Sequence, residues 1–224
     1  MLRLTPEDHA RVTAAVTEAE RSSDGEIVTI VTDRSDKYHD VALHWAALAS
    51  LAAMALAALF PQIVIGALDL VLGAWRPAPS PGELLAAMTI LAAATFLVAL
   101  LVLRAPALRA ALTPPATKTR RVRARALDLF KAGTEARTQG RTGILLYLSL
   151  YEHRAEIVAD AAIHSKVMPE VWGDAMGDLV THVRQGRAGE GMAAAVARMG
   201  AVLAEHFPRS ADDTNELPDR LIEL

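Results

Sequence analysis

Two long apolar runs interrupt the hydrophobic pattern of the chain, at residues 41–60 and 84–103. Neither contains Asp, Glu, Lys or Arg, and each is about 20 residues long. A helix of that length spans about 30 Å, the thickness of the hydrocarbon core of a bilayer. Most apolar helices in the cores of soluble proteins are shorter than these runs or carry a polar stripe. The pattern therefore favours a transmembrane hairpin over residues 41–103, and two buried core helices are the alternative.

A third, shorter apolar piece lies between these runs, at residues 63–75. Gly66 and Asp69 interrupt it, and it is too short to cross a bilayer. We expect an interfacial or partly re-entrant segment here. Two spans, unlike three, keep the polar pieces on either side of the hairpin on the same face of the membrane.

The remaining sequence alternates between helical and strand periodicities. Thr5-Pro6 and the acid Asp8 form a helix start, and β-branched residues fill positions 26–32, which predicts a buried strand. Strands are also expected at 143–150 and 155–160, and helices at 118–131, 169–186 and 190–206.

One helix and one strand before the hairpin cannot bury themselves, so they need partners from beyond it. A crossover between strands 26–32 and 143–150 favours their parallel pairing, whereas the short turn at 151–154 makes the last two strands antiparallel. The expected fold class is α/β, a small mixed sheet covered by helices with an inserted two-helix transmembrane hairpin. Its parts are residues 1–40, the hairpin 41–103, residues 104–209 and an acidic tail, 210–224, which we expect to be solvated or loosely docked.

The composition of the chain argues against several classes of protein and kinds of site. The 224 residues carry a net charge of −3, which argues against a nucleic-acid-binding protein. The absence of cysteine excludes disulfides, thiolate metal sites and a cysteine nucleophile. Residues 1–32 lack the apolar core of a signal peptide, so we expect no cleaved leader.

Basic residues set the expected orientation. Between residues 104 and 131 there are eight Lys or Arg and one acid, Asp128, while the segment between the two spans offers only Arg76. Lys and Arg near a span favour the cytoplasmic side. We therefore expect a multi-pass protein of the bacterial inner membrane with both termini in the cytoplasm.

The order of these elements resembles the TPM domain of thylakoid-lumen and bacterial envelope proteins. The resemblance rests on GEIVTIV at 25–31, TGILLYLSLYEHRAEIVAD at 142–160 and the two following helices, and it covers residues 4–32 and 119–207. It implies one of three roles: a phosphatase-like enzyme, a calcium-binding protein or an assembly factor. Typical members have an Asp-Asn-Gly turn and a glycine-rich turn at positions that here read Arg141-Thr142-Gly143 and Asp160 to His164. An arginine in place of a carboxylate opposes cation binding.

Two candidate sites follow from these turns. Arg141, Thr142 and Gly143 are expected either to cradle an anion or simply to lead into a strand. Asp160 and His164 form either an acid/base or ligand pair or an ordinary turn and helix cap. The seven histidines show no metal-binding spacing, and we expect no catalytic residue, no metal and no cofactor.

The arginine-rich helix offers the strongest functional pattern. Its cationic residues follow the second span by about 20 residues, at Arg120, Arg121, Arg123 and Arg125. Anionic lipid head groups attract such cations, although the same charges also serve to fix the topology of the hairpin. The expected partners are membrane lipids and another membrane or peripheral protein. We expect a non-catalytic binding or assembly module, with a metal-dependent phosphatase-like hydrolase as the alternative. Transport would need more spans or more intramembrane charge.

Overall fold

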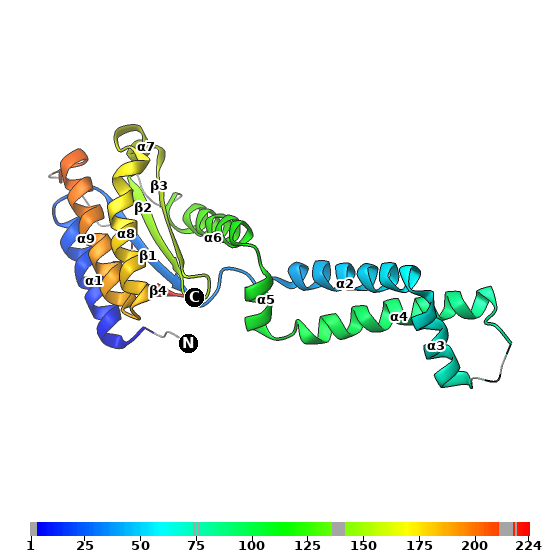
Figure 1. The fold of residues 1–224 in the computed structure, drawn as a ribbon. Coiled ribbons are helices and arrows are strands. Elements are labelled where there is room, and N and C mark those ends of the chain that lie inside the picture. Colours follow the sequence, from blue (N-terminus) through cyan, green and yellow to red (C-terminus); the bar gives the residue numbers. More distant parts are fainter. Residues whose placement is uncertain (1–3, 74, 76, 136–141, 211–216, 218) are drawn as a thin grey trace. The chain divides into compact units, whose positions relative to one another are not determined.

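The computed structural model describes residues 4–73, 75, 77–135, 142–210, 217 and 219–224 (Figure 1). The chain forms two compact units. The first, which we call the α/β domain, joins Met1–Asp36 to Pro115–Leu224. The second, the helical hairpin, is Lys37–Pro114.

A four-stranded mixed sheet, in the order β3-β2-β1-β4, organises the α/β domain. Strands β1 (Glu26–Thr32) and β2 (Gly143–Ser149) are parallel over their full length, although the hairpin separates them in sequence. Strand β3 (Arg154–Ala159) runs antiparallel to β2. The predicted α/β class and both predicted strand pairings are confirmed.

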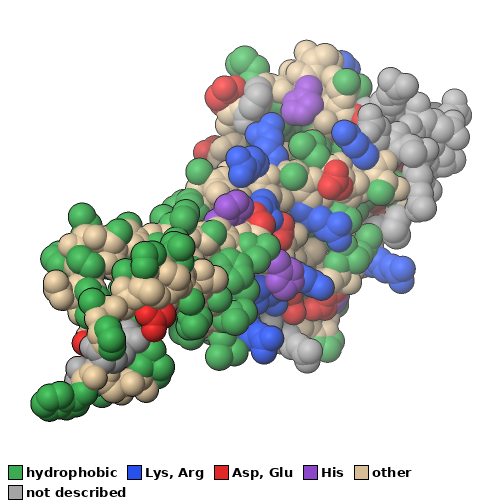
Figure 2. All heavy atoms as spheres, turned by 90° about the vertical axis from the view of Figure 1, so that its right-hand side faces the viewer, with side chains coloured by type: hydrophobic (Ala, Val, Ile, Leu, Met, Phe, Trp, Pro, Cys, Tyr) green, Lys and Arg blue, Asp and Glu red, His purple; other side chains and the backbone are tan. Residues whose placement is uncertain are grey.

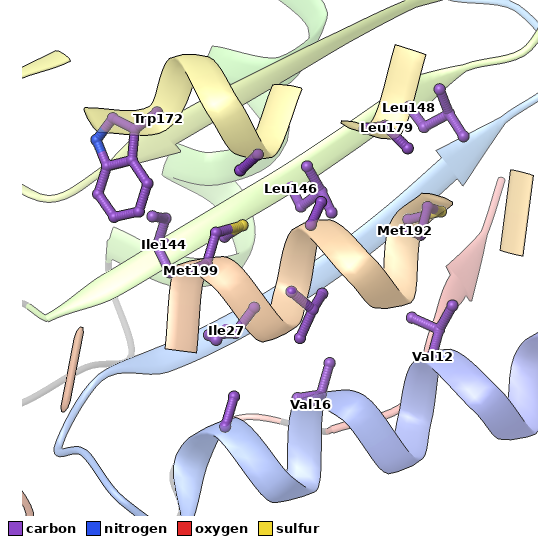
Figure 3. Packing of buried hydrophobic residues seen from close by; sticks show 14 of the residues in the cluster. Val12, Val16, Ile27, Ile144, Leu146, Leu148, Trp172, Leu179, Met192 and Met199 are labelled. Carbon is purple, nitrogen blue, oxygen red and sulfur yellow. The ribbon is translucent and has the colours of Figure 1, made fainter. Parts of the chain in front are cut away.

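Helices cover both faces of this sheet. On one face, α1 (Pro6–Glu20), α8 (Trp172–Arg184) and α9 (Ala188–His206) pack over β1 and β2 (Figure 3). This larger core includes Val12 and Val16 of α1, Ile27 of β1, Leu146 of β2, Leu179 of α8, and Met192 and Met199 of α9.

A smaller core lies on the other face of the sheet, under α6 (Pro115–Phe130). Val122, Ala126 and Phe130 of α6 are buried against the sheet, together with Leu145 and Val158. The opposite face of α6 is polar, which explains why a helix with five basic residues still packs on a sheet. A short helix, α7 (Ala161–Lys166), and a 3₁₀ turn (Pro169–Val171) connect β3 to α8, and a π-helical turn (Lys131–Glu135) follows α6.

The end of the chain differs from the expectation of a solvated or loosely docked tail. Leu217 and Leu221 are buried, and β4 (Ile222–Glu223) pairs in parallel with β1. The prediction was wrong for these residues because it weighed the acidic side chains of the tail over its aliphatic ones. The two leucines and Ile222 have apolar surface to bury, and the second edge of β1 offers them backbone partners.

The helical hairpin contains α2 (His39–Leu59), α3 (Pro61–Leu72), α4 (Pro81–Val102) and α5 (Pro106–Leu112). Helices α2 and α4 pack together, and the hydroxyl of Ser50 donates a 2.9 Å hydrogen bond to the carbonyl oxygen of Ala92. A capping box formed by Ser80 and Glu83 starts α4. The connecting segment predicted at 63–75 is largely helical, as α3.

Both α2 and α4 are long and apolar enough to cross a membrane. Their outward residues are hydrophobic, so the hairpin exposes leucine, valine and isoleucine side chains that a soluble domain would bury (Figure 2). The span of α4 has no buried residues at all. Core helices of a soluble protein are mostly buried, whereas the apolar residues of α4 in this chain are not.

Candidate functional site

A groove of about 410 Å³ runs along the outer edge of β3 in the α/β domain. Helix α6 forms one wall and α8 the other, while β3 lies between them and α7 contributes at one end. We call it the β3 groove; its lining residues are Arg123, Leu127, Ala155, Glu156, Ile157, Val158, His164, Trp172, Gly173 and Met176.

Backbone groups contribute to this groove. The amide of Asp160 donates a 2.9 Å hydrogen bond to the carbonyl of Gly143. This bond shows which opposite residues of β2 and β3 form hydrogen-bonded pairs. Hydrogen-bonded pairs alternate along such a ladder, so Glu156 and Val158 direct their backbone groups toward β2. Ala155 and Ile157 consequently direct their N–H and C=O groups toward the outer edge.

The charged groups in and beside the groove are one carboxyl group, that of Glu156, and two guanidinium groups, those of Arg123 and Arg154. Partial burial raises the pKa of Glu156 above its usual range, and the nearby guanidinium groups of Arg123 and Arg154 only partly offset this shift. Within the described part of the chain, Arg123 forms no hydrogen bond and no ion pair, and its charge acts on Glu156 only through space. Its charge is therefore available to a ligand in the groove.

The structure brings together three residues of the predicted turn sites. The Thr142 hydroxyl donates to the carbonyl of Asp24 at 2.8 Å, and the Gly143 amide donates to the Asp160 carboxylate at 3.0 Å. Asp160 is only 5% exposed. Its carboxylate thus links the first residue of β2 to the residue that follows β3. Arg141 lies outside the described residues.

His164 lies one helical turn beyond Asp160. Its backbone amide donates to the carbonyl of Asp160 at 3.1 Å, whereas its ring is exposed and lines the β3 groove. Among the described residues, no hydrogen bond or ion pair joins the His164 ring to the Asp160 carboxylate. The histidine therefore belongs to the groove rather than to the turn.

The four arginines predicted to contact lipid occupy different surroundings. Arg121 forms an ion pair with Asp36, which ties α6 to the segment that follows β1. Arg123 lines the β3 groove. Arg120 and Arg125 are exposed and remain the predicted candidates for lipid head groups.

A buried polar network at the carboxyl ends of β1 and β2 was not predicted. The Tyr147 hydroxyl lies 2.9 Å from the Thr32 hydroxyl and 2.8 Å from the Ser35 hydroxyl. The Glu152 carboxylate accepts hydrogen bonds from the Ser35 amide and the Ser149 hydroxyl. Polar residues at alternate positions of an otherwise apolar strand were the available signal. Since Ser149 is fully buried, this network holds the strand ends together rather than presenting a nucleophile.

Across the part of the chain that the structure describes, no three His, Asp or Glu side chains are arranged to hold a metal ion. Glu20, Glu26 and Asp219 approach one another where α1, β1 and the C-terminal segment meet, but they are occupied by protein groups. The Ile27 amide donates to Glu20, the Leu217 amide to Glu26 and the Thr17 hydroxyl to Asp219.

Comparison with known proteins identifies a fold but no family. No protein-family model matches the chain, and no curated protein matches it. Among solved structures, the chain is similar to the NMR structure of BA42 protein from the psychrophilic bacterium Bizionia argentinensis. The TM-score is 0.56 with 16% sequence identity, and the alignment covers 99% of this chain and 95% of that one. At this identity the similarity establishes a shared α/β fold alone.

Proposed function

We propose that this protein is a membrane-anchored, TPM-like binding or assembly module on the cytoplasmic face of the bacterial inner membrane, without catalytic activity of its own. The parallel pairing of β1 with β2 carries the proposal. Because one strand precedes the helical hairpin and the other follows it, both must lie on the same side of any membrane that the hairpin enters. The excess of basic residues after α4 supports the cytoplasmic side.

Binding is favoured over catalysis by the chemistry of the candidate sites. The Asp160 carboxylate is buried and accepts the Gly143 amide, and Ser149 is inaccessible. The β3 groove offers apolar walls, outward-facing backbone groups and the guanidinium of Arg123, which has no ion-pair partner among the described residues. These features suit recognition of a protein segment better than activation of water or phosphate.

Lipids are the second proposed partner. Arg120 and Arg125 are exposed on the polar face of α6, and cations close to an anionic membrane surface contribute about 1 kcal/mol each. Nothing in the charge of the chain suggests nucleic acid as a partner.

Calorimetric calcium titration and a phosphatase assay on the full chain in detergent test the absence of catalysis. We expect no tight calcium binding and no hydrolysis of a generic phosphate ester. The Asp160→Asn variant is the control, because an amide oxygen can still accept from Gly143. Calcium binding or turnover that disappears in this variant would replace the binding module with a metal-dependent phosphatase-like hydrolase, the activity that the TPM resemblance also permits.

A further inference from the structure

We propose that the outer edge of β3 binds an acidic, extended segment of a partner protein, which adds to the sheet as a further strand between α6 and α8. This inference deepens the proposed binding function and rests on it. The proposed mode of binding is backbone pairing with β3, and the bound segment is acidic.

The outer edge of β3 presents backbone groups that do not pair with β2. Strand β3 ends the strand order, and Ala155 and Ile157 direct their amide and carbonyl groups away from β2. Exposed strand edges are usually blocked by proline, by charged side chains and above all lysine, or by a bulge. Strand β3 contains neither proline nor lysine and pairs with β2 in unbroken register, and its two charged side chains, Arg154 and Glu156, are half-buried. Such an edge is suited to strand addition.

The shape of the groove decides what can reach this edge. Strand β3 lies between walls formed by Leu127 of α6 and by Trp172 and Met176 of α8, and its side chains are half-buried or buried. A second copy of the chain carries its own β3 in the same recess, so two such edges cannot meet. A single extended segment from a tail or linker is narrow enough to enter.

Charge complementarity identifies the chemistry of the segment. Arg123 on the α6 wall has no ion-pair partner among the described residues, and Arg154 lies near Glu156 on the same face of β3. Two guanidinium groups therefore oppose a single, partly buried carboxyl group. An Asp or Glu side chain on the incoming strand pairs with Arg123, while small apolar side chains contact the α8 wall.

The experiment uses the full chain in detergent micelles and three synthetic peptides. The probe is acetyl-Thr-Val-Asp-Val-Thr-Val-Thr-amide. One control peptide carries Lys in place of Asp, and the other has N-methylated alternate residues that cannot donate backbone hydrogen bonds. We expect the acidic probe to bind and to slow hydrogen exchange at the amides of Ala155 and Ile157. The N-methylated peptide should not bind, and the lysine peptide should bind at least about tenfold more weakly.

Two matched pairs of variants locate the binding site. A Cβ atom at Gly173 or at Gly177 of α8 meets nothing within 4 Å, so a side chain can leave the backbone at either position without a clash at its first carbon. Gly173 lines the groove and Gly177 does not. Gly173→Leu should abolish probe binding, and Gly177→Leu should leave it unchanged. Likewise, Arg123→Gln should weaken binding of the acidic probe by about tenfold, whereas Arg125→Gln should not.

Each of the following outcomes overturns the proposal: no binding of the acidic probe at millimolar concentration, exchange protection elsewhere than β3, or equal effects of the paired variants. None of these outcomes depends on membrane orientation or on hydrolysis. If the calcium and phosphatase assays remain negative while the peptide fails to bind, the binding module stands and only strand addition is wrong. Binding of all three peptides alike would indicate non-specific hydrophobic adsorption and would also overturn it.

Discussion

At the scale of single residues, the half-buried carboxyl group of Glu20 lies where three segments of the α/β domain meet. Glu20, the last residue of α1, accepts a 2.8 Å hydrogen bond from the Ile27 amide. Burial raises its pKa to about 8, and the neighbouring carboxylates of Glu26 and Asp219 add to the shift. Glu20 is therefore protonated at neutral pH, and it helps to hold α1, β1 and the C-terminal segment together.

This protonation makes stability depend on pH. In the unfolded chain Glu20 releases its proton near pH 4.5, whereas in the fold it keeps the proton until about pH 8. Unfolding therefore releases a proton between these values, and stability falls as the pH rises through this window. Glu20→Gln should flatten the dependence and raise the melting midpoint above that of the wild type at pH 8.5. Glu18→Gln, at an exposed position of the same helix, should keep the wild-type dependence of the melting midpoint on pH. If Glu20→Gln also keeps that dependence, the protonation of Glu20 in the fold is contradicted.

The Tyr147 hydroxyl supports a second residue-scale prediction. Tyr147→Phe removes a buried hydroxyl that bonds to Thr32 and Ser35 and leaves both without that partner. We expect a loss of roughly 1–2 kcal/mol, measured as a midpoint lowered by a few degrees in thermal unfolding. An unchanged midpoint would show that the two hydroxyls find other partners at no cost.

At the scale of elements, close packing of α1 on α9 shapes the larger core. A Cβ atom at Gly200 of α9 would lie 2.5 Å from the Cβ atom of Ala19 on α1, so the two helices meet through their smallest residues. This contact explains why α9 is rich in alanine and glycine although it is buried. Large side chains there would separate the helices from each other.

Substitutions of glycine test this contact. Gly200→Val should destabilise the domain by about 1–3 kcal/mol because the added carbons overlap Ala19. Gly177→Val on α8, where a Cβ atom meets nothing, should cost little or nothing. Thermal unfolding compares the two variants, and equal midpoints would contradict the packing described for α1 and α9.

The sequence predicted elements with strong local periodicity and failed where tertiary contacts decide the structure. The strands at 26–32 and 143–150 were predicted closely because β-branched and apolar runs are strong local signals. Strand β4 was missed because two residues carry no periodicity and pair only after β1 is in place. The β3 groove was missed for a related reason: its walls come from α6 and α8, and only His164 and Arg123 stood out in the sequence.

At the scale of the whole molecule, one domain is interrupted by the helical hairpin. Strand β1 pairs with β2 on one side and with β4 on the other, so Met1–Asp36 depends on Pro115–Leu224 for its burial. The hairpin, Lys37–Pro114, forms a separate compact unit. We therefore expect the α/β domain to fold without the apolar helices.

Replacing residues 37–114 with a flexible Gly/Ser linker tests this independence. We expect a soluble protein that unfolds in one cooperative transition, because the sheet and both cores remain complete. Deleting residues 1–36 from that protein should prevent folding, since it removes β1, one of the two inner strands of the sheet. Equal stability with and without these residues would disprove the shared sheet.

We propose that the hairpin crosses the membrane twice and that both parts of the α/β domain lie in the cytoplasm. Topology reporters fused at Pro79, between α3 and α4, and at Leu224 test this topology in bacterial cells. We expect the Pro79 fusion to report the external side and the Leu224 fusion the cytoplasm. Reporters on the same side, or a Leu224 fusion on the external face, would contradict it.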